Sequence, residues 1–94
     1  MTFEWDGPKE RGNIQKHGVD FHEASSCFTD PLKIEVYDEV HSIVEDRFIL
    51  FGISFKGRLL AVCHVERGYD RARIITARIA TKKERDFYNQ SNQP

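Results

Sequence analysis

The spacing of apolar residues changes along the chain from a helical pattern to an extended one. Phe21, Ala24 and Phe28 recur at intervals of three and four residues, as they do on one face of an amphipathic helix. From Leu32 to Tyr37, apolar and polar residues alternate, which is typical of a half-buried strand. The pattern therefore predicts helices in the first third of the chain and strands after it.

Helix-ending residues divide the first third into two helices. The segment Asp6-Gly7-Pro8 places a proline in the first turn of a helix, where its missing N–H does no harm. Gly18 can take the left-handed conformation that closes this helix. Asp20 and Glu23 have the spacing of a capping box, and Pro31 ends the helix that they open. We therefore expect helices over residues 8–17 and 21–28.

The remainder of the chain predicts four strands and a last helix. The expected strands cover residues 32–37, 47–54, 58–66 and 71–80, and residues 38–46 form a polar loop. Lys56-Gly57 is a compact hairpin signal between the second and third strands. Thr81 and Glu84 form a second capping-box pattern, which opens a helix that carries Tyr88.

This order of elements indicates one domain of the α+β class. Strands joined by short loops, with helices grouped at the ends, predict two N-terminal helices, a four-stranded antiparallel sheet and a C-terminal helix. A chain of 94 residues can bury one modest core. We expect a single domain over residues 1–94, ordered over about residues 2–89, with a frayed polar tail at 90–94.

Cysteine usage and hydropathy favour the reduced cytoplasm. Cys27 and Cys63 each lie in an apolar stretch, which favours small buried side chains over a secreted disulfide framework. The N-terminus lacks the basic and apolar segments of a signal peptide. No stretch reaches the length of a transmembrane helix, so we expect no contact with a membrane.

The charge is divided unevenly between the two parts of the chain. Residues 1–54 hold five Lys/Arg and eleven Asp/Glu, a net charge of −6, whereas residues 55–94 hold nine and four, a net charge of +5. Such asymmetry suggests a surface for a polyanion or an acidic partner. Two ordinary solvated faces explain the charge counts equally well.

Cations cluster on the consecutive antiparallel elements of the basic part, so several can meet on one concave sheet face. A helix N-terminus is itself an anion site, and the predicted last helix begins with two lysines. Those lysines can equally extend into water and pair with Glu84 or Asp86. For Arg78 we favour a functional role over a surface role. It lies inside a strand pattern, where a solvent-facing threonine or an apolar core residue would be the ordinary choice. The cations are Arg58, Arg67, Arg71, Arg73, Arg78, Lys82, Lys83 and Arg85.

The residue types suit cleavage of RNA without a metal ion. The spacings of His and Cys match no metal site, and no nucleophile motif occurs. RNA cleavage needs a base, an acid and fixed cations. His17 and His64 could exchange protons, Arg67 and Arg78 could grip phosphate oxygens, and Tyr88 could stack on a base or share a proton.

Each of these histidines also has a non-catalytic interpretation. His64 can be a simple cross-strand neighbour, and His17 can merely follow the favourable charge of a helix C-terminus. We interpret His22 and His41 as surface residues. If Glu66 pairs with Arg71, His64 and Arg78 lie on opposite faces of the sheet, whereas a bulge at Tyr69 would reverse this.

Several motifs together resemble the BrnT toxins of bacterial type II toxin–antitoxin systems. In chain order they are "FEWD", "NIQKHGVDFHEA", "RFILFGIS", "GRLLAVCHVERG" and "RIITARIATKKERDFY". The resemblance implies a RelE-like ribonuclease fold and a cytoplasmic enzyme that arrests translation. It also implies a BrnA-like antitoxin that forms a hetero-oligomer with the toxin and binds operator DNA.

The resemblance also implies roles for individual residues. Arg67 of "ERG" and Arg78 of "TARIA" become the leading catalytic cations, and Lys16, His17 and Tyr88 occupy motif positions as well. The predicted function is that of a metal-independent endoribonuclease without a cofactor. In the predicted reaction the 2′-hydroxyl of the RNA attacks the adjacent phosphate. The alternative is a non-catalytic module with the same fold that binds nucleic acid or antitoxin. The predicted RNA contacts are Arg58, Arg71, Arg73, Lys82, Lys83 and Arg85.

Overall fold

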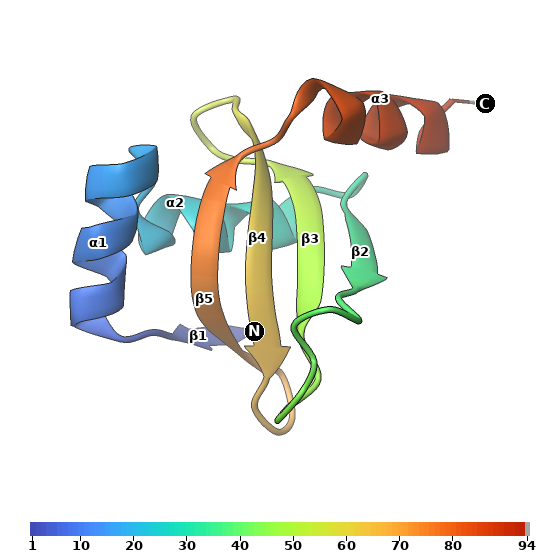
Figure 1. The fold of residues 1–94 in the computed structure, drawn as a ribbon. Coiled ribbons are helices and arrows are strands. Elements are labelled where there is room, and N and C mark those ends of the chain that lie inside the picture. Colours follow the sequence, from blue (N-terminus) through green and yellow to red (C-terminus); the bar gives the residue numbers. More distant parts are fainter. Residues whose placement is uncertain (94) are drawn as a thin grey trace.

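The computed structural model describes residues 1–93, which form a five-stranded sheet with three α-helices and one short 3-10 helix (Figure 1). Position 94, in the predicted frayed tail, lies outside this range. In chain order the elements are β1 (Thr2–Glu4), α1 (Gly7–His17), α2 (Phe21–Ser26), η1 (Cys27–Thr29), β2 (Ile34–Tyr37), β3 (Phe48–Ile53), β4 (Leu59–Glu66), β5 (Arg71–Ile79) and α3 (Lys82–Ser91).

The sheet is mixed rather than purely antiparallel. Its strand order is β1-β5-β4-β3-β2, and β1 pairs in parallel with β5 while all other neighbours are antiparallel. The α+β class and the order of the predicted elements are confirmed, but the predicted four strands lack β1. A strand of three residues is too short to display the alternation that marks a strand in a sequence.

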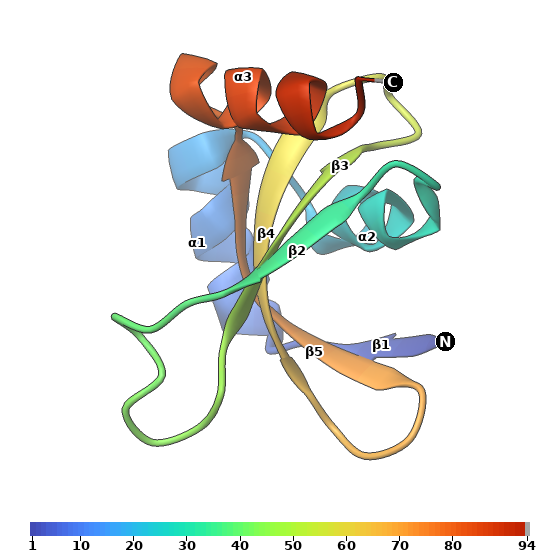
Figure 2. The same ribbon diagram turned by 90° about the vertical axis from the view of Figure 1, so that its right-hand side faces the viewer.

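The two faces of the sheet are covered differently. On one face, α2 packs over a core that includes Phe21, Leu50 and Val62. On the other face, α3 lies across the end of the sheet, where Tyr88 joins Phe51 in a second cluster. The loop between β2 and β3 projects on the side away from α2 (Figure 2). The second face is therefore left open between α3 and this loop.

Helix α1 lies beside β5, beyond the end of β1 (Figure 1). The buried Asn13 side chain accepts from Ala77 N at 3.1 Å and donates to Ala77 O at 2.8 Å, so it replaces a strand partner at this edge. Gly18 closes α1 with φ 69°, and its N–H donates to Ile14 O at 2.8 Å. The predicted left-handed helix end is confirmed.

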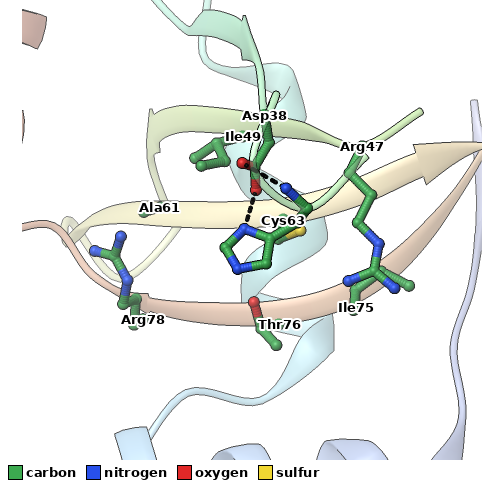
Figure 3. Close-up of a pocket in the computed structure, with 9 residues that line it drawn as sticks. Asp38, Arg47, Ile49, Ala61, Cys63, Ile75, Thr76 and Arg78 are labelled. Atoms are coloured by element: carbon green, nitrogen blue, oxygen red, sulfur yellow. Dashed lines mark hydrogen bonds and ion pairs between the residues drawn. The ribbon is translucent and has the colours of Figure 1, made fainter. Parts of the chain in front are cut away.

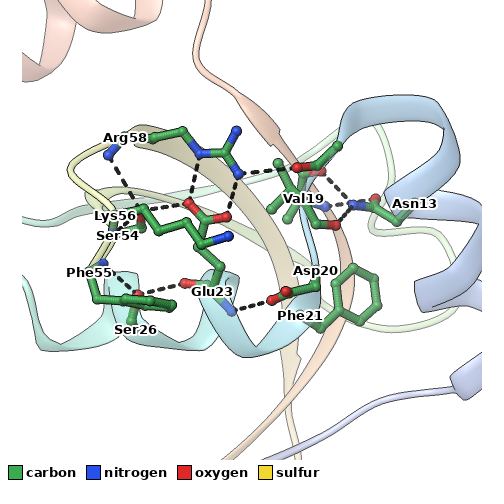
Figure 4. A network of polar contacts seen from close by, with 12 residues as sticks. Asn13, Val19, Asp20, Phe21, Glu23, Ser26, Ser54, Phe55, Lys56 and Arg58 are labelled. Atoms are coloured by element: carbon green, nitrogen blue, oxygen red, sulfur yellow. Dashed lines mark hydrogen bonds and ion pairs between the residues drawn. The ribbon is translucent and has the colours of Figure 1, made fainter.

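The capping box predicted at Asp20 forms only in part (Figure 4). Asp20 accepts from Glu23 N at 2.6 Å, but the Glu23 carboxylate turns away and accepts from Ser54 Oγ at 2.7 Å and from Arg58 Nε at 2.9 Å. The hydrogen bond from Arg58 lowers the pKa of this fully buried carboxyl group. The capping box at Thr81 is complete, as predicted.

The register of β4 and β5 settles which side chains share a face. Glu66 pairs with Ala72 rather than with Arg71. His64 pairs with Ile74 and Cys63 with Thr76, so the extra residue of a β-bulge is Ile75. His64 packs on the α2 side against Phe28. Arg78, opposite Ala61, lies on the other face, which is one of the two arrangements that the sequence allowed.

Candidate active site

The loop between β2 and β3 is closed by hydrogen bonds at its base. The N–H of Asp38 donates to Arg47 O at 2.8 Å. Ser42 Oγ donates to Asp38 O at 2.6 Å and accepts from Arg47 N at 2.9 Å. These bonds bring Asp38 and Arg47 side by side, although nine positions separate them in the sequence.

This loop and the open face of the sheet enclose a cleft of about 220 Å³, which we call the arginine cleft (Figure 3). Pockets for whole small molecules usually measure 300–1,000 Å³, so the cleft suits one unit of a longer ligand. The bulge at Ile75 lets that residue and Thr76 both face it. The lining residues are Asp38, His41, Arg47, Ile49, Ala61, Cys63, Ile75, Thr76 and Arg78.

The two arginines of the cleft have different partners. The Nε atom of Arg47 is buried and has no hydrogen-bond partner within residues 1–93. Arg78 donates from Nη1 and Nη2 to the Glu84 carboxylate at 2.7 and 2.9 Å, which lowers the pKa of Glu84 to about 2. A guanidinium has five N–H donors, so Arg78 retains others for a ligand.

The cleft also contains a histidine held by a carboxylate. His41 Nδ1 lies 2.8 Å from Asp38 Oδ2. The Asp38 side chain is only 9% exposed, whereas that of His41 is 65% exposed. The ring is therefore accessible to a ligand while its partner is shielded.

Arg67 lies far from Arg78, although the sequence motifs assign both to catalysis. Arg78 pairs with Ala61 of β4, six residues before Arg67. At about 3.3 Å per residue this corresponds to roughly 20 Å along the strand. Arg67 instead approaches Glu45, with a nitrogen–oxygen distance of 3.7 Å.

His64 is enclosed on the face opposite the cleft. Its side chain is 2% exposed and its ring lies 4.8 Å from that of Phe28. Its Nε2 is 2.8 Å from Glu35 Oε1, yet neither ring nitrogen forms a well-directed hydrogen bond within the described chain. Burial lowers the pKa of His64 to about 4 and raises the pKa of Glu35, so both groups favour their neutral forms.

Tyr88 is also directed into the protein. Its hydroxyl donates to Asp30 Oδ2 at 2.6 Å and the residue is 6% exposed. Burial and the neighbouring Asp30 carboxylate raise the pKa of Tyr88 to about 12. Asp30 accepts as well from Ile53 N at 2.8 Å, so the contact joins α3 to η1 and β3.

Lys16 and His17 lie next to the arginine cleft rather than inside it. They line a second hollow between α1 and β5, together with Lys9. Ile75 and Thr76 line both this α1 hollow and the arginine cleft. A chain-like ligand in the cleft can therefore continue over β5 towards α1.

The remaining predicted RNA contacts are spread over the molecule. Arg73 pairs with Glu4 at 2.9 Å, Lys82 with Asp86 at 3.1 Å, and Arg58 with Glu23. Lys83 and Arg85 are exposed on α3. Arg71 lines a larger cavity, of about 420 Å³, beside His64. That cavity is lined by charges of both signs, Lys33 and Arg71 beside Glu35, Glu66 and Asp70, so it lacks the predominantly positive lining that favours a polyanion.

Three cleft residues were missed by the sequence interpretation. Asp38, His41 and Arg47 lie in or next to the loop that we expected to be a polar surface segment. The available signal was an acidic residue three positions before a histidine. That signal became informative only once the loop closure had placed Arg47 beside both residues.

Residues 1–93 contain neither a cluster of metal ligands nor a helix that could span a membrane. Within residues 1–93, no group of three or more His, Cys, Asp or Glu side chains could hold a metal ion. None of the helices in the same range has the length and apolar character needed to cross a bilayer. Cys27 and Cys63 are free thiols, as expected.

Comparisons with known proteins identify similar chains. The sequence model of the family described as "Ribonuclease toxin, BrnT, of type II toxin-antitoxin system" matches residues 5–84. The crystal structure of the Brucella abortus ribonuclease toxin BrnT is similar over 87% of this chain and 99% of its own, with a TM-score of 0.64 and 25% sequence identity. No curated protein matches the chain.

Proposed function

Because the chain belongs to the BrnT family of ribonuclease toxins of type II toxin–antitoxin systems, we propose that it cleaves RNA in the arginine cleft. Membership confirms the resemblance read from the sequence motifs and implies a cognate antitoxin. The proposed reaction needs no metal ion. The 2′-hydroxyl attacks the adjacent phosphate, which yields a 2′,3′-cyclic phosphate and a 5′-hydroxyl end.

The observation that carries this proposal is the charge of Arg47 in the cleft. Arg47 lines the cleft, yet within the described residues it forms no ion pair with a carboxylate. Its positive charge is therefore not neutralised by the protein, and an anionic ligand in the cleft would neutralise it. RNA supplies such a ligand in the form of its phosphate groups.

Arg47 and Arg78 supply the positive charge that phosphate cleavage requires. Both line the cleft, one from the end of the β2–β3 loop and one from β5 (Figure 3). Negative charge on the phosphate oxygens grows as the 2′-oxygen attacks, and fixed cations lower the free energy of that state. Glu84 holds the Arg78 guanidinium in place through two hydrogen bonds.

We assign Lys16 and His17 to a neighbouring nucleotide. They line the α1 hollow, which shares Ile75 and Thr76 with the cleft. Contacts to backbone phosphates position a nucleic acid and add affinity that falls with salt. In this proposal His64 and Tyr88 take no part in the reaction, because both are nearly inaccessible.

For the antitoxin we propose that a BrnA-like partner forms a hetero-oligomer with this protein and covers the cleft. An inhibitor does best with negative charge facing Arg47 and Arg78, because it then occupies the electrostatic footprint of RNA. Contact with operator DNA would occur only through that partner. We further propose that the protein acts in the cytoplasm, where its RNA substrate is found.

Cleavage of RNA by the purified protein in EDTA tests the proposal. Free RNA is offered in EDTA, translated mRNA is offered in a separate extract that keeps its Mg²⁺, and the ends of the products are determined. We expect cyclic phosphate ends, and a rate that falls by about 10²–10³-fold in Arg47→Ala and Arg78→Ala, the usual cost of losing one charge-stabilising donor. Arg11→Ala, an exposed arginine on α1 outside the cleft, is the matched control.

The alternative function is a non-catalytic binding module. Intact RNA in both assays, together with salt-sensitive retention of RNA by the protein, would support that alternative and overturn the enzyme proposal. Cleavage that requires an added metal ion would overturn the metal-independent step.

A further inference from the structure

A histidine–carboxylate pair stands in the wall of the arginine cleft. His41 Nδ1 lies 2.8 Å from Asp38 Oδ2, and His41 lines the cleft together with Arg47 and Arg78. We infer that His41 is the general base that takes the 2′-hydroxyl proton of RNA, and that Asp38 is the positioning residue that holds its ring. This inference rests on the proposed function.

The Asp38 carboxylate is fixed before any substrate arrives. Its side chain is 9% exposed. Its backbone N–H donates to Arg47 O at 2.8 Å, and its backbone carbonyl accepts from Ser42 Oγ at 2.6 Å. The loop therefore holds this carboxylate from both sides of the main chain, so that it can orient a neighbouring ring.

The contact with Asp38 determines which nitrogen of His41 can act as a base. A carboxylate accepts hydrogen bonds, so Nδ1 is the nitrogen that carries the proton in the neutral ring. The lone pair is then on Nε2, at the far side of the ring from Asp38. Because the side chain is 65% exposed, a hydroxyl group of a bound nucleotide can reach it.

The surroundings of His41 place a phosphate next to this base. The charged or titratable groups that line the cleft around it are Asp38 and Arg47 from the loop region, Cys63 from β4 and Arg78 from β5, and Glu45 shares a further hollow of the loop with His41 and Arg47. Of these, the two guanidinium groups attract the phosphate, whereas the Asp38 carboxylate faces His41 Nδ1. A base and two cations that can bind phosphate thus line one cleft, and these are the groups that attack by an adjacent hydroxyl requires.

The other histidines do not share this arrangement. His64 is buried on the opposite face, and His22 on α2 lies against Phe55, with 5.7 Å between ring centroids. His17 lines the α1 hollow on the other side of Thr76. Within residues 1–93, His41 is therefore the histidine that lines the cleft with both arginines.

His41 moves one proton during the cleavage step. Nε2 of His41 accepts the proton of the 2′-hydroxyl while the 2′-oxygen forms a bond to phosphorus. The bond between phosphorus and the 5′-oxygen of the next nucleotide breaks, and that oxygen takes a proton from water. The imidazolium then returns its proton to water, so the enzyme is regenerated and no electrons are exchanged.

Single-turnover cleavage of a labelled mixed-sequence RNA in EDTA tests the assignment. We expect His41→Ala to lower the rate by about 10²–10⁴-fold, the usual contribution of a general base. Affinity for the same sequence with 2′-deoxy sugars should change by less than about twofold, since uniform binding is retained. Added imidazole should restore part of the rate. Asp38→Asn should alter the pH dependence of the rate, which a purely structural role would not.

The controls separate failure of this inference from failure of the proposed function. His22→Ala, on α2 and outside the cleft, should cleave like the unmodified protein, and thermal melting of each variant verifies folding. If the unmodified protein cleaves RNA and His41→Ala cleaves equally fast, His41 is not the base. If His41→Ala loses deoxy-RNA binding in proportion to its rate, His41 is a binding residue and the inference fails. If the unmodified protein does not cleave, the proposed function itself fails.

Discussion

Two histidine–carboxylate pairs lie on opposite faces of this sheet, and in both a ring nitrogen is 2.8 Å from a carboxylate oxygen. In the pair of His41 and Asp38, the ring is 65% exposed and the carboxylate 9%. In the pair of His64 and Glu35, the ring is 2% exposed and the carboxylate 40%. The distances are equal, but only the first pair forms a well-directed hydrogen bond, and the two pairs also differ in which partner is shielded.

Shielding decides what each histidine can do. A shielded carboxylate presents an accessible ring in a fixed orientation, which is the arrangement used by bases in catalytic triads. A shielded ring cannot reach a substrate, and burial disfavours its charged form. The low pKa of His64, about 4, expresses this cost. We therefore associate the first pair with catalysis and the second with the pH dependence of stability.

Exchanging each carboxylate for its amide tests the comparison most strongly. Asp38→Asn should lower the RNA cleavage rate by about 10²-fold or more, because an amide no longer fixes the productive tautomer of His41. Glu35→Gln should leave the rate nearly unchanged, since Glu35 and His64 lie away from the arginine cleft. Both rates are measured by single-turnover cleavage at neutral pH. Equal losses in the two variants would remove the distinction between the pairs.

The pair of His64 and Glu35 should make the free energy of unfolding depend on pH. The pKa of His64 is about 4 in the folded protein and about 6.5 in an unfolded chain. Between these values the unfolded state binds a proton that the folded state does not, so the free energy of unfolding falls as pH decreases from about 6.5 to 4. The loss is at most about 3 kcal/mol. The raised pKa of Glu35 acts in the opposite direction and offsets part of it.

Urea denaturation at a series of pH values measures this loss. In His64→Leu the decrease between pH 6.5 and about 5 should largely disappear, because the titrating ring is absent and the carboxyl groups with a lowered pKa, Glu23, Asp30 and Glu84, destabilise the fold mainly below that range. The variant should be about as stable as the unmodified protein at pH 7, since the buried ring nitrogens lack hydrogen bonds and their removal leaves no unpaired donor. An unchanged acid dependence in His64→Leu would assign the loss to other groups.

The fold could be predicted because its signals are local. The left-handed Gly18, the capping box at Thr81 and the hairpin at Gly57 each depend on residues within a few positions of one another. Strand β1 escaped prediction because three residues cannot show a period. The Glu23 side chain does not complete the expected capping box, because Arg58, which lies 35 positions away, is a stronger hydrogen-bond donor than the local backbone.

The site was harder to predict because it depends on how deeply each side chain is buried and on which residues distant in the sequence lie together. The motifs indicated the family and the cleft residue Arg78, yet the sequence interpretation placed His64 among the catalytic residues and His41 on the surface. The choice between the two histidines depends on which of them lies at the cleft. His64 lies on the opposite face of the sheet from Arg78, and the bulge at Ile75 lies between the pairings of Cys63 with Thr76 and of His64 with Ile74. The separation of Arg67 from Arg78 likewise follows from the sheet register, which one sequence does not specify.

Tyr88 extends the comparison to a third polar group that the sequence placed in catalysis. Like His64, it is shielded, and its hydroxyl donates to Asp30 at 2.6 Å. Tyr88→Phe should lower the free energy of unfolding by about 1–2 kcal/mol, because Asp30 loses one hydrogen bond to a charged acceptor. Cleavage activity should stay within about twofold of the unmodified protein. A large loss of activity with normal stability would return Tyr88 to the catalytic set.

Arg67→Ala should have the smallest effect, and it distinguishes the cleft from a site near the β4–β5 turn. Arg67 is 46% exposed and 3.7 Å from a half-exposed Glu45, a geometry that contributes at most about 1 kcal/mol to stability. Because Arg67 lies roughly 20 Å along β4 from the position opposite Arg78, we expect the cleavage rate to fall by less than about threefold. Arg47→Ala, measured in the same assay, provides the contrasting large loss. If instead Arg67→Ala abolished cleavage and Arg47→Ala did not, the phosphate would have to bind at the turn, and neither histidine–carboxylate pair would be adjacent to the reaction.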